Sequence, residues 1–369
     1  MRPVTTSPTP RTIDRGAGIR RFYWELVAAR KDGVSPAGAL ADLRLAPALG
    51  ALRAAAGDHL VRIACVVELP EGLDESNAHT TAQPLLEARD ALAPHDIALD
   101  IWPQLPCSPA SHARFLNTST ATTYQQRLLP LLDALSRHGG PDIGDHIGVA
   151  LDIEPSEHLM RAAWSVRDNK TSLWARASAA VGLVKGVGRA LLDARQGRRD
   201  LTELARDLSH RGLPVHAAVL PPLASGQRSD AWRTWTLGIP VVDAEGEPLF
   251  GTQAAMCYAP LAQRIPGNQG SWSRENEKRT LALWAARHRS MFDAVVVGQT
   301  SWGVLGDEPI YQDPRVFGED VRAMEALGYS DVAVYALEGI LFGPSGMPGA
   351  LRPDVDAWIG AACGEMPRS

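Results

Sequence analysis

The stretch 146–156, HIGVALDIEPS, decides the fold because it reads as a buried strand that ends in two carboxyl side chains. Valine, isoleucine and leucine favour a strand, and Pro155 cannot continue a hydrogen-bonded ladder. Residues two apart on a strand share a face, so Asp152 and Glu154 are expected to point the same way. The pattern predicts a strand over 146–154 that carries both carboxyls at its C-terminal end.

Seven further apolar runs resemble this one in length and composition. They cover 20–26, 59–69, 96–105, 214–223, 252–261, 293–302 and 331–340. Nearly continuous apolar runs are typical of parallel strands that are buried on both faces.

Helical patterns separate these runs, at 36–57, 82–92, 122–140, 273–292, 315–330 and 354–362. Eight strand–helix pairs in sequence predict a (β/α)8 TIM barrel, formed as one domain over 18–363. Two connections are long: 155–213, expected to hold a loop and two helices, and 224–251, expected to be a loop. An open doubly wound sheet is disfavoured, since VAARKDG rather than a glycine-rich turn follows the first run.

Composition excludes several functional classes. The 369 residues are 45% hydrophobic and carry a formal net charge of −5, which gives no basic footprint for nucleic acid. No window approaches 18 consecutive apolar residues, so no membrane span is expected. The four scattered cysteines predict neither a zinc site nor a disulfide framework, and no metal or cofactor is predicted.

The ends of the chain are expected to lie outside the barrel. Residues 1–17 are rich in proline and threonine and predict a disordered tail, and 364–369 form a short C-terminal tail. The first stretch lacks an apolar secretion signal, which predicts a cytoplasmic protein unless a leader has been removed.

Polar and aromatic side chains gather at the predicted C-terminal ends of the strands, where α/β barrels carry their active sites. Two close carboxyls cannot both ionise freely, so one of them tends to keep its proton at neutral pH. Eight of the ten tryptophans fall at strand ends or in the loops that follow, and flat indole rings suit stacking on sugars. Beside Asp152 and Glu154, the candidate site residues are Trp24, Glu25, Glu68, Asp100, Trp102, Tyr258, Gln299, Trp302, Tyr335 and Glu338.

The fourth run resembles the motif of the family-18 glycoside hydrolases, which comprise chitinases and endo-N-acetylglucosaminidases on (β/α)8 barrels. That motif is D-x-x-D-x-D-x-E on the fourth strand. Asp152 and Glu154 match its last two acidic positions, whereas Ala150 and Ile147 stand where the other two aspartates would be.

Later runs add to the resemblance. Met256-Cys257-Tyr258 is similar to the Met-x-Tyr-Asp of the family's sixth strand, with Ala259 in place of the aspartate. GQTSWG at 298–303 is similar to the seventh strand, and Tyr335 stands at the pocket-floor tryptophan of the eighth.

The resemblance implies substrate-assisted hydrolysis of an N-acetylhexosamine-containing glycan. Glu154 would protonate the leaving oxygen, Asp152 would orient the 2-acetamido group, and Tyr258 would hydrogen-bond its carbonyl. The missing aspartates leave a non-catalytic carbohydrate-binding barrel open. A family-25 lysozyme-like muramidase also has Asp-x-Glu at a strand end, and a metal-dependent lyase or isomerase could use Glu68, Asp100 and Glu154. The expected partner is an oligosaccharide, and the sequence predicts no oligomeric state.

Overall fold

A computed structural model describes residues 18–27, 30, 33–106, 114–140, 146–155, 173–219, 239, 248–262, 274–289, 294–302 and 309–365. Within them, side chains are described only in part between 173 and 195 and not at 261, 262, 284 and 287. Residues 1–17 and 366–369, assigned above to tails, and Trp164, Trp174, Trp232, Trp235 and Trp272 therefore lie outside the description or have no described side chain.

Eight parallel strands close into a barrel in chain order, with β8 pairing to β1. They are β1 (Ile19–Trp24), β2 (Leu60–Glu68), β3 (Ile97–Gln104), β4 (Ile147–Ile153), β5 (Val215–Val219), β6 (Thr252–Tyr258), β7 (Ala294–Gly298) and β8 (Asp331–Tyr335). Each begins within one residue of its predicted start, and the predicted (β/α)8 fold is confirmed.

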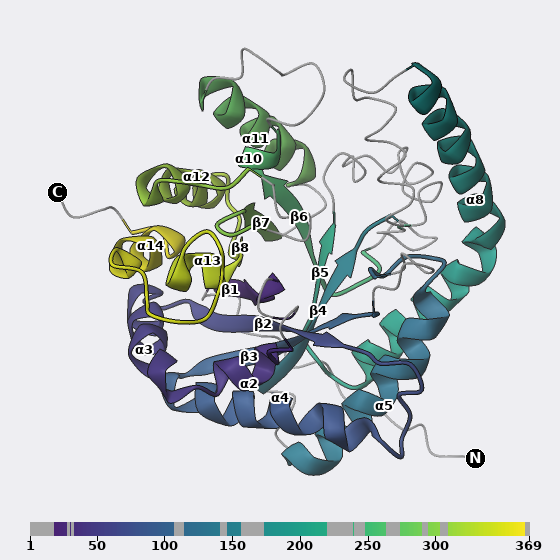
Figure 1. Cartoon of the computed structure of the whole chain (residues 1–369), viewed down its shortest axis with the longest axis horizontal. Coiled ribbons are helices and arrows are strands. Elements are labelled where there is room, and N and C mark those ends of the chain that lie inside the picture. The colour runs from purple at the N-terminus through teal and green to yellow at the C-terminus, as the bar shows by residue number, and fades with distance from the viewer. Residues whose placement is uncertain are drawn as a thin grey trace, which may run out of the picture.

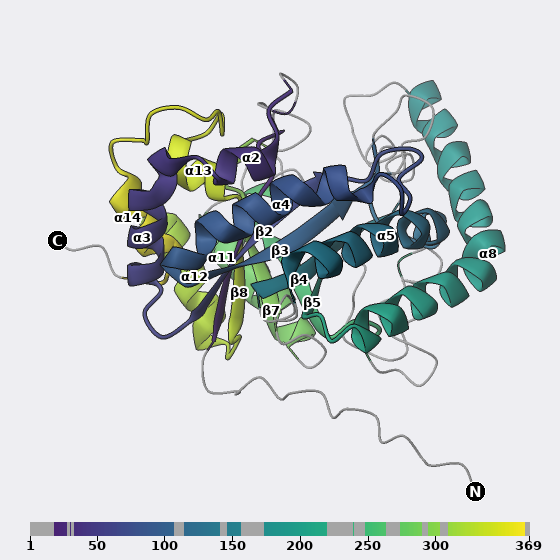
Figure 2. The ribbon, with the colours of Figure 1, turned by 90° about the horizontal axis from the view of Figure 1, so that it is seen from below.

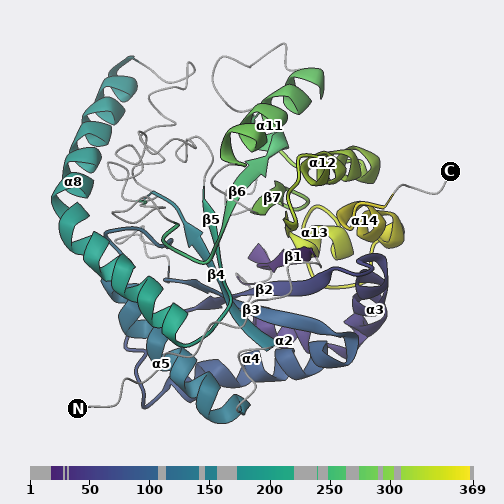
Figure 3. The same cartoon turned by 180° about the vertical axis from the view of Figure 1, so that it is seen from behind.

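Helices surround the strands, as Figures 1 and 3 show from opposite sides. They are α2 (Pro36–Leu40), α3 (Ala46–Ala55), α4 (Ala78–Leu92), α5 (Ala121–Gly139), α8 (Leu173–His210), α10 (Ala259–Ala262), α11 (Arg274–His288), α12 (Pro314–Ala326), α13 (Leu337–Phe342) and α14 (Val355–Ala362), with short 3₁₀ turns at Leu43–Leu45 and Ala93–His95. No helix of the described part is both long enough and apolar enough to cross a membrane.

Predicted and observed elements differ in several places. The helix expected over 36–57 is broken, because the side chain of Asp42 accepts a hydrogen bond from Arg44 N and starts a new turn there. The run expected as a strand to 340 turns into α13, which buries Leu337, Ile340 and Leu341 at helical spacing. In the connection 155–213, predicted to hold a loop and two helices, the described part from 173 on holds the single long helix α8 at the edge of the molecule (Figure 2).

Successive side chains of each strand point alternately outward and inward, so the apolar side chains form two separate layers. Outward-facing side chains pack under the helices in one large cluster, and inward-facing ones form a smaller cluster within the barrel. Trp24 belongs to the outer layer: it is fully buried, its indole N–H donates to Pro36 O at 2.9 Å, and its ring lies 6.0 Å from Phe342. Trp24, a candidate substrate-binding residue, therefore faces the helices, and its contact with a substrate stays a prediction.

The lower half of the barrel interior holds a buried charged cluster. Asp100 Oδ2 accepts from Arg21 Nε at 2.7 Å, and its Oδ1 accepts from Arg62 Nε at 2.8 Å. Arg21 also donates to Asp331 at 2.8 Å, and His216 lies beside that pair. Asp100, a candidate substrate-binding residue, thus lies midway along β3 with both carboxylate oxygens engaged by arginines, and its contact with a substrate stays a prediction.

Gly148 on β4 makes room for this cluster. A Cβ atom at this position would lie 2.2 Å from Asp100 Oδ1 and 2.8 Å from Arg62 Nη2. Only a residue without a side chain allows the carboxylate to approach the strand so closely.

Candidate active site

The backbone that carries the acidic pair is held by the segment that precedes α5. Asp152 is an interior residue of β4, and Glu154 follows the last residue of that strand. A short segment before α5 runs beside them: Leu116 N donates to Asp152 O at 3.0 Å, and Glu154 N donates to Leu116 O at 3.3 Å. Asn117 Nδ2 also donates to Glu154 O at 3.1 Å. These bonds extend the ladder beyond β4 and hold the two side chains as neighbours on one face.

Both carboxyls of the pair favour their protonated forms. Burial, then the neighbouring Glu154 and Glu25, hold the pKa of Asp152 well above its usual range. Burial, opposed by the guanidinium of Arg114, raises the pKa of Glu154 to about 7. Asp152 Oδ1 is buried without a hydrogen-bond partner among the described residues. Adjacent carboxyls share their protons, so the pair can act as an acid near neutral pH.

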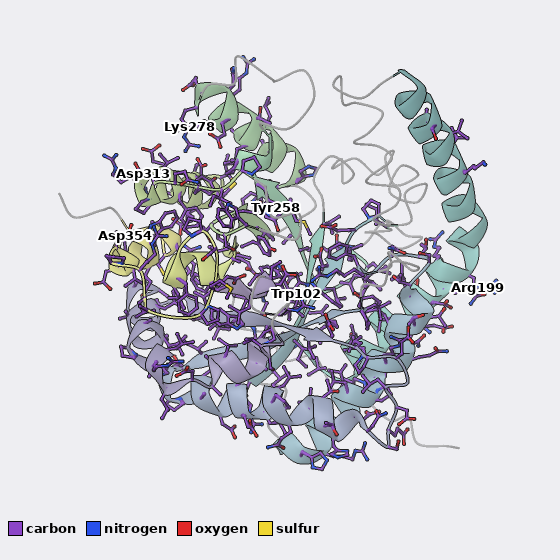
Figure 4. The ribbon with its side chains drawn as sticks, viewed as in Figure 1. Trp102, Arg199, Tyr258, Lys278, Asp313 and Asp354 are labelled. Carbon is purple, nitrogen blue, oxygen red and sulfur yellow. The ribbon has the colours of Figure 1, made fainter. Side chains whose placement is uncertain are left out.

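Four aromatic rings form the floor beneath the pair. Trp102 meets Tyr23 edge-on, with ring centres 4.9 Å apart, and Tyr335 lies 6.0 Å from Trp102 and stacks on Tyr258 at 5.7 Å. Figure 4 shows Trp102 and Tyr258 inside the ring of helices, whereas the labelled Lys278, Asp313, Asp354 and Arg199 lie on its outer side. The indole N–H of Trp102 and the hydroxyl of Tyr23 find no partner in the described part of the chain.

A second polar group stands at the ends of β1 and β3. Glu25 accepts from Arg114 Nη2 at 2.6 Å and from the Tyr335 hydroxyl at 2.5 Å. Gln104 accepts from Arg114 Nε at 2.7 Å and from Arg30 Nη1 at 3.2 Å. The candidate Glu25 is therefore a fully bonded, buried group that orients Tyr335 and Arg114.

The other strand-end candidates lie in different surroundings. Glu338 is buried and accepts from the backbone N–H groups of Glu25 and Leu26, so it braces the turn after β1; burial raises its pKa to about 8. Gln299 is buried, with its Oε1 unpartnered within the described residues. Glu68 is exposed and pairs with Arg30, and Trp302 is 46% exposed. Neither Glu68 nor Trp302 is shown to contact the acidic pair.

Sequence reasoning missed Arg114, Gln104 and Tyr23. Gln104 and Tyr23 share the inward faces of β3 and β1 with Trp102 and Arg21, so the alternation of the strands was a usable signal for both. Arg114 lies in a stretch whose sequence has no periodicity, and nothing in the sequence marks it.

A metal centre finds no support in the described residues. No three side chains among their histidines, cysteines, aspartates and glutamates are grouped as metal ligands. Asp100, one of the carboxylates considered for such a site, is bonded to arginines instead.

Comparisons with known proteins do not assign a family. No family model matches the chain. No curated protein matches it either. Solved structures to which it is similar include a GH5-4 broad specificity endoglucanase from an uncultured bacterium, with 13% identity, a TM-score of 0.47, and coverage of 86% of this chain and 84% of the other.

Two further solved structures to which the chain is similar are enzymes of other kinds. A GH18 chitinase from Pseudoalteromonas aurantia shows 9% identity and a TM-score of 0.38 over 86% of this chain and 93% of the other. A D-allulose 3-epimerase from Methylomonas sp. shows 12% identity and a TM-score of 0.41 over 94% and 96%. The similar structures thus include glycosidases as well as a sugar epimerase. This similarity therefore does not single out one activity.

Proposed function

We propose that this protein is a glycoside hydrolase acting on a glycan that contains N-acetylhexosamine, with Glu154 as its general acid. The observation that carries the proposal is the pair of adjacent carboxyls at the end of β4, in which Glu154 has a pKa of about 7. A carboxyl that keeps its proton near neutrality is suited to protonating a glycosidic oxygen.

Two steps follow for the acidic pair. In the first, Glu154 gives its proton to the glycosidic oxygen as the bond from that oxygen to C1 breaks, and the acetamido carbonyl oxygen of the substrate closes on C1. In the second, water adds to C1, the bond to the acetamido oxygen breaks, and the proton of the water goes to the Glu154 carboxylate. The unpartnered Oδ1 of Asp152, beside Glu154, supports a role in orienting the acetamido group.

The aromatic floor supports a sugar as the substrate. Tyr258 is partly exposed and offers its ring to the apolar side of a pyranose, while the buried Tyr335 stacks on it and Trp102 meets Tyr335 edge-on. Rings of this kind cost little conformational entropy on binding. Tyr258 is half-buried, so its hydroxyl is a candidate donor to the acetamide oxygen.

The participation of the substrate's acetamido group in hydrolysis is tested by comparing substrates that differ only in that group. Oligomers of N-acetylglucosamine, the same oligomers after deacetylation, and a peptidoglycan digest are incubated with the protein, and the products are identified by mass spectrometry. We expect cleavage only next to N-acetylated sugars. Equal cleavage of the deacetylated oligomers would contradict the participation of the acetamido group.

A non-catalytic carbohydrate-binding barrel is the second candidate, and Ala150 favours it. This residue is fully buried in the inner cluster of the barrel, where it brings no carboxylate near Asp152. For this candidate the same oligomers would bind, as measured by calorimetry, and none of them would be cleaved.

A further inference from the structure

Arg114 is bonded to the polar group of β1 and β3, and it lies two residues before Leu116, which flanks the acidic pair. Its side chain is nine-tenths buried, and it donates to Glu25 Oε1 at 2.6 Å and to Gln104 Oε1 at 2.7 Å. Both acceptors are themselves buried strand-end side chains. A guanidinium bonded to two such acceptors has a defined position and little freedom to turn away.

The backbone at Arg114 is fixed as firmly as the side chain. Its carbonyl accepts from the Tyr124 hydroxyl at 2.7 Å and from Leu105 N at 3.1 Å. Two residues later, Leu116 forms the ladder bonds to the backbone of Asp152 and Glu154. One short segment therefore both carries the cation and flanks the acidic pair, so the distance between them is set by the fold.

The charges around the pair come from several elements. Asp152 lies two residues before Glu154, and Glu25 follows β1. The carboxyls of the pair help to raise the pKa values of Tyr258 on β6 and of Tyr124 on α5, whose hydroxyl donates to Pro103 O and Arg114 O. Burial raises the pKa of Glu154 most, Arg114 lowers it, and Glu25 raises it again. Arg114 is thus the cation that opposes burial at the pair, and Glu25 partly neutralises it.

We propose that Arg114 is the positioning residue of this site, acting as the counter-charge that sets the pH range over which Glu154 exchanges its proton. This inference rests on the proposed function for its consequence in catalysis, but not for its test. Arg114 does not have to touch the substrate, because it acts through Glu154.

The test is a titration of Glu154 followed by NMR on the full chain with ¹³C-labelled glutamate carboxyls. The Glu154 resonance is assigned by its absence in Glu154→Gln. In Arg114→Gln we expect the midpoint to rise by roughly one to three pH units, the range associated with a close opposite charge. Arg30→Gln is the matched control, since Arg30 also contacts Glu25 and Gln104. Its midpoint should stay at the wild-type value.

Equal midpoints in Arg114→Gln and Arg30→Gln would overturn the proposal. If Arg114→Gln does not fold, Arg114→Lys decides instead. The flexible ammonium cannot keep both of the hydrogen bonds that fix the guanidinium, so the Glu154 midpoint should rise, and an unchanged or lowered midpoint would overturn the proposal. If the wild type cleaves glycans, the basic limb of its kcat/KM profile should move with these midpoints. Absence of any cleavage would count against the proposed function alone, because the titration requires no turnover.

Discussion

Replacing Asp100 by asparagine should destabilise the barrel strongly. The carboxylate is 1% exposed and accepts from Arg21 at 2.7 Å and from Arg62 at 2.8 Å, and both arginines are buried as well. Asparagine removes the charge and leaves two buried guanidiniums with Asp331 as the remaining carboxylate of the cluster. Breaking a buried ion pair from one side costs about 3–5 kcal/mol. That is roughly a third of the stability of a typical domain.

The assay is urea-induced unfolding followed by circular dichroism, with the free energy of unfolding extrapolated to water. Asp90→Asn serves as the control, since Asp90 pairs with Arg89 while its side chain is 66% exposed. Exposed pairs contribute about 0–1 kcal/mol, so this variant should unfold like the wild type. A loss below about 1 kcal/mol in Asp100→Asn would refute the reasoning that the cluster is a buried, mutually dependent unit.

Three further outcomes are expected. The pKa values of Asp100 and Asp331 lie below their usual range, so the stability that they contribute is present above about pH 4 and should be lost as the pH falls below it, which acid unfolding monitored by fluorescence would show. Gly148→Ala should lower the urea midpoint, because its Cβ would lie 2.2 Å from Asp100 Oδ1; an unchanged midpoint would contradict the close approach. Hydrolysis should decline above about pH 7 as Glu154 loses its proton, and a kcat/KM profile that stays flat to pH 9 would exclude Glu154 as the acid.

The strands could be predicted because parallel strands that are buried on both faces have nearly continuous apolar sequences. The same alternation brought Asp152 and Glu154 to one face. The same alternation also predicts the direction of Trp24: because Tyr23 and Glu25 face inward, the Trp24 side chain between them must face the helices.

The depth of a side chain along the barrel axis was harder to predict. Asp100, Trp102 and Gln104 share the inner face of β3, yet one joins the lower cluster, one the aromatic floor and one the strand-end group. The stagger between neighbouring strands decides among these places. Asp100 lies opposite Gly148 near the start of β4, and that register is not visible in the run of residues. Arg114 could not be found for a related reason, since its partners come from distant strands.

Turnover by the wild type and by Glu154→Gln, on oligomers of N-acetylglucosamine and analysed by mass spectrometry, tests the central claim most directly. We predict that the wild type cleaves these oligomers and that Glu154→Gln binds them without cleaving them. Equal cleavage by both proteins, or binding without cleavage by both, would contradict the assignment of Glu154 as the general acid of a glycoside hydrolase.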